Sequence, residues 1–317
     1  MGMAAVRIGL LGPLEVAVND RPVVIAGQRR RVVLAALALA AGRSVRGTVL
    51  ADHLRYDGDR SSARRSLQTT VSRLRQALGI DVIAGSPGFY RLEVDPLAVD
   101  VHRFRALTAP GRRPADPATE LGALDDALGL WRGEPLSDID APLLVEEHLP
   151  SLIEQWLGAV ERRADLMLAA GRHRELPAQL RELTARYPLR ESLWHRLMVA
   201  LYRSGRQAEA LTAYQQVREM LADQLGVDPS DDLQRLHGGV LTRDRAASGS
   251  TAVGFPAMAW ALRRAASVGG PGAGAGEARQ AAEPAPPAAG PRRAASDGCV
   301  ARARAAGPPV CGAADDA

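Results

Sequence analysis

Residues Ser61–Arg91 read SSARRSLQTTVSRLRQALGIDVIAGSPGFYR, and this stretch predicts the fold of the N-terminal part of the chain. Its first half has one apolar stripe at helical spacing, formed by Leu67, Val71, Leu74 and Leu78. Its second half has two short runs of strand-forming residues around a Gly/Pro turn. The stretch therefore predicts a long amphipathic helix followed directly by a β-hairpin.

The helix face opposite the apolar stripe has an unusual composition. At about 100° per residue, it carries Arg, Gln, Ser and Thr and no carboxylate, with Ser62 beside the candidate base-reading residues Arg65, Gln68, Thr69, Ser72, Arg73 and Gln76. An ordinary solvated helix face mixes Glu with Arg, because opposite charges four residues apart stabilise it. A helix in the DNA major groove instead needs bidentate Arg and Gln donors. For the helix alone, an Arg-rich surface helix is the alternative interpretation.

The hairpin favours the DNA-binding interpretation. Alternation in Phe89–Val94 places Phe89, Arg91 and Glu93 on one face of the second strand. A helix followed by a basic hairpin is typical of a winged helix, in which the helix reads bases and the wing contacts phosphates. The candidate wing residues are Ser86, Gly88, Tyr90 and Arg91.

The residues before this stretch complete the predicted domain. Val6–Ile25 predicts strands around a turn at Asn19-Asp20. Gln28–Ala41 and Thr48–Leu54 are the predicted first and second helices. We expect a winged-helix domain over residues 1–96.

The middle of the chain contains a helical repeat. LMLAAGRHRELPAQL (166–180) aligns with ALYRSGRQAEALTAY (200–214) at an offset of 34 residues, the period of tetratricopeptide helix pairs. Pro177 falls inside one predicted helix, residues 173–186. The predicted fold class is mainly α with a small β component: a winged helix-turn-helix domain followed by an all-α, tetratricopeptide-like domain over residues 97–245.

Three segments carry a family resemblance. LQTTVSRLRQALG (67–79) with GFYRL (88–92) resembles the response-regulator type of winged-helix effector domain. LDDALGLWRGEPLSDI (124–139) and PLRESLWHRLMVALYRSGRQAEALTAYQQVREMLADQLGVDPSDDLQRLH (188–237) resemble the opening and the C-terminal part of the bacterial transcriptional activation domain. In this order they resemble the Streptomyces antibiotic regulatory protein family over roughly residues 6–245. The resemblance implies a pathway-specific activator of a secondary-metabolite (antibiotic) gene cluster that binds direct repeats near the −35 element and recruits RNA polymerase.

Charge is distributed unevenly along the chain. All 40 basic residues are Arg, and the net charge is +4. Residues 1–100 hold 14 Arg and 9 carboxylates, whereas residues 101–245 hold 19 Arg and 22 carboxylates. A basic first domain beside an acidic second one fits a division between DNA contact and protein contact.

The composition of residues 246–317 predicts a disordered tail. They are rich in Ala, Gly and Pro without periodicity, and too little apolar surface is present to order them. Cys299 and Cys311 lie in this segment and match no zinc or redox motif.

Enzymatic, metal-binding and membrane functions find no support in the sequence. The six His residues form no metal or catalytic motif, so we expect no enzyme activity, no metal and no cofactor. The apolar run Val32–Ala41 is too short to cross a bilayer, and no secretion signal is apparent, so we expect a cytoplasmic protein with no membrane partner.

Two function classes remain. The first is a transcription activator whose partners are double-stranded promoter DNA and RNA polymerase, with self-association on DNA. The second is a helical-repeat adaptor, or a repressor that acts by promoter occlusion. A salt titration of DNA binding separates DNA-binding from non-DNA-binding roles, because phosphate contacts make affinity fall steeply with salt.

Overall fold

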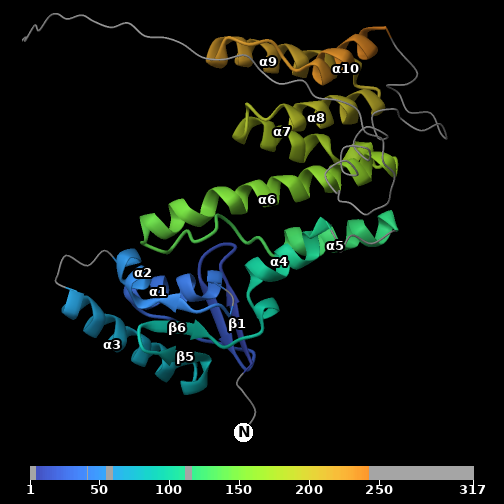
Figure 1. Ribbon diagram of the computed structural model, residues 1–317. Coiled ribbons are helices and arrows are strands. Elements are labelled where there is room, and N and C mark those ends of the chain that lie inside the picture. Colours follow the sequence, from blue (N-terminus) through green and yellow to red (C-terminus); the bar gives the residue numbers. More distant parts are fainter. Residues whose placement is uncertain (1–4, 41, 55–59, 111–115, 243–317) are drawn as a thin grey trace, which may run out of the picture. The chain divides into compact units, whose positions relative to one another are not determined.

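The computed structural model describes residues 5–40, 42–54, 60–110 and 116–242 (Figure 1). The N-terminal elements, in chain order, are β1 (Val6–Gly9), β2 (Glu15–Val18), β3 (Arg21–Pro22), α1 (Gln28–Ala40), β4 (Val45–Arg46), α2 (Gly47–His53), α3 (Arg60–Leu78), β5 (Ile83–Ser86) and β6 (Phe89–Leu92). Helices α4 to α10 follow, so the predicted fold class is confirmed for the described residues. The predicted disordered tail, 246–317, lies outside them.

The first sheet is antiparallel, with the order β1-β2-β3. Its tight turn is at Asn19 and Asp20, whose φ angles are 50° and 63°. Positive φ at both central residues is the requirement of a type I′ hairpin turn, and Asn and Asp tolerate it best among residues with a side chain. The turn predicted at this dipeptide is therefore confirmed.

The second sheet contains a strand that was not predicted from the sequence. Its order is β4-β6-β5, and β4 is only two residues long, Val45–Arg46. In the hairpin, Ile83 pairs with Leu92 and Ser86 pairs with Phe89. Strand β5 thus runs to Ser86, and the turn consists of Pro87 and Gly88.

Helix α3 covers the core of this part of the chain through its apolar stripe. The side chains of Leu67, Val71, Leu74 and Leu78 are at most 2% exposed. They pack in one cluster with α1, whose residues 32–39 are all buried. The predicted stripe is confirmed.

In the helical part, α5 packs against α4 and α6, and α8 packs against α6, α7, α9 and α10 (Figure 1). Its helices are α4 (Asp100–Thr108), α5 (Pro117–Gly129), α6 (Pro142–Ala169), α7 (Pro177–Arg186), α8 (Glu191–Arg203), α9 (Gln207–Leu225) and α10 (Asp231–Leu241). The expectation of one helix over residues 173–186 was wrong. The segment divides into a 3-10 turn, His173–Glu175, and α7, which begins at Pro177 because proline lacks the N–H that a helix interior requires but fits the first turn.

The two repeat units match in their local geometry. Gly171 and Gly205 follow α6 and α8 with φ angles of 76° and 77°. This left-handed conformation ends a helix and costs glycine little. Ala210 in the second unit is fully buried and allows α8 and α9 to approach closely.

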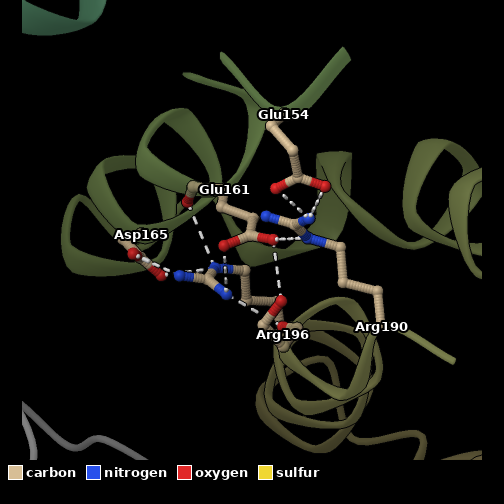
Figure 2. A network of polar contacts seen from close by, with 6 residues as sticks. Glu154, Glu161, Asp165, Arg190 and Arg196 are labelled. Atoms are coloured by element: carbon tan, nitrogen blue, oxygen red, sulfur yellow. Dashed lines mark hydrogen bonds and ion pairs between the residues drawn. The ribbon is translucent and has the colours of Figure 1, made fainter. Parts of the chain in front are cut away.

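A network of ion pairs fixes α8 against α6. Figure 2 shows Glu161 between the guanidinium groups of Arg190 and Arg196. Arg190 Nη1 also lies 2.8 Å from Glu154 Oε2, and Arg196 Nη2 lies 2.8 Å from Asp165 Oδ2. Because each arginine bridges two carboxylates of one helix, the network sets both the spacing and the register of α8 along α6.

Side chains of the helical part hold the connection between β1 and β2. The Asp100 carboxylate, at the start of α4, accepts hydrogen bonds from the backbone N–H groups of Leu10 at 2.8 Å and Leu11 at 2.9 Å. Asp138 Oδ1 accepts a hydrogen bond from the N–H group of Leu14 at 2.8 Å. The connection therefore obtains hydrogen-bond partners from beyond residue 96.

Arg132 joins the same connection from a second side. Its Nη2 lies 3.1 Å from Asp100 Oδ2, and its Nη1 lies 2.7 Å from Glu15 Oε1. Nη1 also donates to the carbonyl oxygen of Pro13 at 3.1 Å. A methyl group on Gly9 would collide with this guanidinium, so the absence of a side chain at this position lets the guanidinium lie here without shifting. We call Asp100, Arg132 and Asp138, with the connection that they hold, the interdomain clamp.

One hydrophobic core spans the clamp. It extends from the first sheet through α1 and α3 to α4, α5 and α6, and Phe104 of α4 is fully buried in it. A second core lies among the C-terminal half of α6 and helices α7 to α10. The predicted boundary at residue 96 stays a prediction. Side chains from Val99 to Leu166 contribute to the core of the winged helix, so residues 1–96 alone would lack part of that core.

We predict that Arg132→Ala lowers the free energy of unfolding by about 1–3 kcal/mol, because it leaves a mostly buried Asp100 carboxylate without its cation. Urea-induced unfolding of the full chain measures the change. Arg235→Ala is the matched control, because the Arg235 side chain is 74% exposed and pairs only within α10. The control should cost about 0.5 kcal/mol or less. Equal stability of the two variants would contradict the structural role of the clamp.

Candidate nucleic-acid interface

The predicted reading face of α3 is open to solvent. All six candidate residues are exposed: Arg65, Gln68, Thr69, Ser72, Arg73 and Gln76. The whole helix, Arg60–Leu78, contains no carboxylate. The face thus offers guanidinium, amide and hydroxyl groups without a competing negative charge, which is the chemistry that base edges and phosphates require.

Two details of this face were not predicted. Arg64 is also exposed and lies beside Gln68 on the helix, so the cationic face is wider than expected. The Thr69 hydroxyl donates to the backbone carbonyl of Arg65 at 3.1 Å. Thr69 must give up this local bond, or offer only its oxygen, to contact a base.

Arg75 attaches the wing to the helix. Its Nε donates to the carbonyl oxygen of Ile83 in β5 at 2.9 Å. The side chain is half-buried and lies against Gly85. Arg75 is therefore a positioning residue for the hairpin. Helical spacing places Arg75 at the edge of the stripe and gives no sign of its partner, so the sequence did not predict this role.

The predicted wing residues do not share one face. Ser86, Gly88 and Arg91 are exposed, whereas Tyr90 is half-buried and packs against the core. The alternation predicted for β6 accounts for this, because Tyr90 and Arg91 point to opposite sides of the sheet. The Gly88 carbonyl accepts a hydrogen bond from the N–H of Gly47 at 2.8 Å, which ties the wing tip to the start of α2.

The charge of Arg91 is balanced by a neighbour on the same face. Arg91 Nε donates to Glu93 Oε1 at 2.6 Å, and the Arg91 side chain is 48% exposed. A phosphate near the wing therefore has to compete with Glu93 for this guanidinium.

Three of the histidines lie in partly or fully buried positions. His53 in α2 is 8% exposed, and burial lowers its pKa. Burial also lowers the pKa of His102 and of His148, so the three rings favour the neutral form within the fold. The described residues contain no group of three or more His, Cys, Asp or Glu that could hold a metal ion. Among the described helices, none has the length and apolar character needed to cross a membrane.

The comparisons with known proteins agree with this arrangement. The protein-family description "Bacterial transcriptional activator domain" matches residues 99–241. Regulatory protein DnrI of Streptomyces peucetius is 37% identical over 256 residues, which cover 75% of this chain and 93% of DnrI. Regulatory protein AfsR of Streptomyces griseus is 36% identical over 244 residues, which cover 76% of this chain and 25% of AfsR.

A solved structure extends the likeness to three dimensions. Mycobacterium tuberculosis EmbR, in complex with a low-affinity phosphopeptide, superimposes with a TM-score of 0.73 and 32% sequence identity. The match covers 84% of this chain and 70% of the EmbR chain. The similarity to DnrI extends over nearly the whole length of DnrI. The chain therefore belongs to the Streptomyces antibiotic regulatory protein family, and it is a DNA-binding bacterial transcriptional activator, not an enzyme.

Proposed function

We propose that this activator binds direct repeats near the −35 element of a promoter and recruits RNA polymerase to a secondary-metabolite gene cluster. The observation that carries the proposal is the exposed, carboxylate-free face of α3 on a winged helix. The family supplies the class of promoter and target. The proposed place of action is the cytoplasm, where bacterial promoters lie.

The proposed reading mode follows from the donors on α3. Arg65 and Arg73 suit the O6 and N7 atoms of guanine, and Gln68 and Gln76 suit adenine, because each pairing is bidentate. Ser86, Gly88 and Arg91 would approach phosphates near the wing and would support affinity more than sequence choice. Tyr90 would act through the packing of the wing.

The interdomain clamp supports a division of labour between the two parts. The helical part would hold a second copy of the chain on the neighbouring repeat and would supply the polymerase contact. Because the clamp fixes α4 and the loop before α6 to the β1–β2 connection, a polymerase bound to the helical part would have a defined position relative to the DNA. Repression by promoter occlusion or an adaptor role would need no such fixed geometry.

We predict that Arg73→Ala weakens binding to the preferred promoter DNA by about 1–3 kcal/mol and relaxes the preference at one base pair. Titrations with the preferred duplex and with singly substituted duplexes measure both effects at physiological salt. Arg218→Ala removes the same charge from an exposed position on α9 and should change neither. Unchanged affinity and unchanged selectivity in Arg73→Ala would contradict the assignment of this residue as a base reader.

We predict opposite effects for the two partners of the wing ion pair. Arg91→Ala should weaken binding to all sequences and flatten the plot of log affinity against log salt by less than the roughly 0.9 units of an unpaired phosphate contact, because Glu93 already balances part of the Arg91 charge. Glu93→Gln should strengthen binding to all sequences, because it frees Arg91 and removes a charge that repels phosphates. A change of base preference at constant slope in either variant would mean that the wing reads bases instead.

We predict that activation depends on the helical phase of the repeats. Two copies bind the same face of DNA when the repeats are about one helical turn apart. Inserting about half a turn, roughly 5 base pairs, should abolish transcription in a purified system with RNA polymerase. Residues 1–242 should activate as well as the full chain, because they include both cores. Equal activation from in-phase and out-of-phase repeats would contradict the cooperative arrangement.

A further inference from the structure

The second sheet aligns three outward residues from three different strands. Arg46 of β4 pairs with Phe89 of β6, and Phe89 pairs with Ser86 of β5. Residues paired across neighbouring strands project to the same side of a sheet. The inward neighbours Val45 and Tyr90 pack against the core, so this lateral set faces outward. We call Arg46, Phe89 and Ser86 the wing row.

The wing row combines an unpaired cation with an exposed ring. Arg46 is exposed, and its side chain makes no hydrogen bond or ion pair with the described residues. Phe89 is 38% exposed, which is unusual for a phenylalanine outside a contact surface. Arg91 on the same side is paired with Glu93, so Arg46 is the arginine of this sheet whose charge is available without breaking a bond.

The position of the wing row relates it to the reading helix. Gly47, the residue after Arg46, donates its N–H to the wing-tip carbonyl of Gly88 at 2.8 Å. A methyl group on Gly47 would lie 3.4 Å from Leu67 Cδ2 of α3 and 3.5 Å from the Gly88 oxygen. The chain at Arg46–Gly47 therefore runs between α3 and the wing tip.

A duplex bound by α3 and the wing has a sugar-phosphate strand between these two contacts. The major groove that holds a recognition helix is bordered by backbone, and a wing contacts the backbone or minor groove next to it. We propose that the wing row binds this strand: the Arg46 guanidinium neutralises a phosphate, and the Phe89 ring packs on the adjoining deoxyribose. The inference rests on the proposed DNA-binding mode and adds β4 to the surface that carries it.

The proposal has a quantitative consequence for salt dependence. Each neutralised phosphate adds about 0.9 to the slope of log affinity against log salt. Arg46→Ala should therefore reduce the slope by about 0.9 for each copy bound and weaken binding about eightfold at 0.1 M salt. Both a preferred and an unrelated duplex should be affected equally, because phosphates carry no sequence information.

The test compares four variants of the full chain on two duplexes, one selected by the wild-type chain from random-sequence DNA and one unrelated duplex of equal length. Arg46→Lys should retain the slope, and Arg218→Ala on α9 is the control for loss of charge. Phe89→Ala should weaken binding to both duplexes at constant slope. Circular dichroism checks that each variant is folded.

The outcomes separate this inference from the proposed function. If the wild-type chain bound neither duplex, the proposed function and the inference would both fail. Suppose instead that the wild-type chain binds and that Arg46→Ala shows the same slope of log affinity against log salt as Arg218→Ala. The wing row is then not a phosphate contact, and only the inference fails. Unchanged affinity of Phe89→Ala would overturn the packing of its ring on DNA, and a changed base preference for Arg46→Ala would overturn the phosphate assignment.

Discussion

The arrangement of the winged helix and the helical part depends on the hydrogen bonds and the ion pair of the Asp100 carboxylate. The Asp100 side chain is 11% exposed and accepts hydrogen bonds from the backbone N–H groups of Leu10, Leu11 and Val101. It also forms an ion pair with Arg132. A carboxylate so far from water costs free energy unless all these donors are present. Separation of the winged helix from α4 would leave both the carboxylate and the N–H groups of the β1–β2 connection without partners. The geometry of the clamp therefore holds the two parts together.

Continuity of the core has a consequence for how such an activator works. Domains joined by small polar interfaces move relative to one another by default. Here Phe104, Trp131 and Trp156 extend the core of the winged helix into the helical part, with ring centroids 5.5 and 5.8 Å apart. In the proposed mode, a DNA site bound by α3 would determine where α4 to α6 lie, and the ion-pair network around Glu161 would fix the position of α8 in turn. The proposed spacing between DNA and polymerase would then be set by packing rather than by a linker.

The sequence predicted features that depend on local periodicity and missed those that depend on distant partners. The stripe of α3 and the exposure of its opposite face follow from helical spacing, and the Asn19-Asp20 turn follows from backbone preference. Strand β4 is too short for any alternation to reveal it, although it supplies Arg46. The hydrogen bonds of the clamp join residues 90 and 124 positions apart, and no pattern in one sequence pairs them. The sequence shows a proline at position 177. It does not show where the preceding turn ends, and this end decides whether Pro177 begins a helix or interrupts one.

The contribution of each arginine to DNA binding depends on whether its guanidinium is already paired within the protein, and not on the number of arginines in the chain. Arg132, Arg190 and Arg196 are held by carboxylates and act in folding, and Arg75 is held by a carbonyl oxygen and positions the wing. A guanidinium already bound to a carboxylate gains little from a phosphate, because it exchanges one anion for another. An exposed guanidinium without such a partner releases counterions when it binds a DNA phosphate, and this release contributes fully to the free energy of binding. The net charge of +4 therefore says little about affinity for DNA, whereas the carboxylate-free helix α3 and Arg46, which forms no ion pair with a described residue, belong to the surface that we propose to bind DNA.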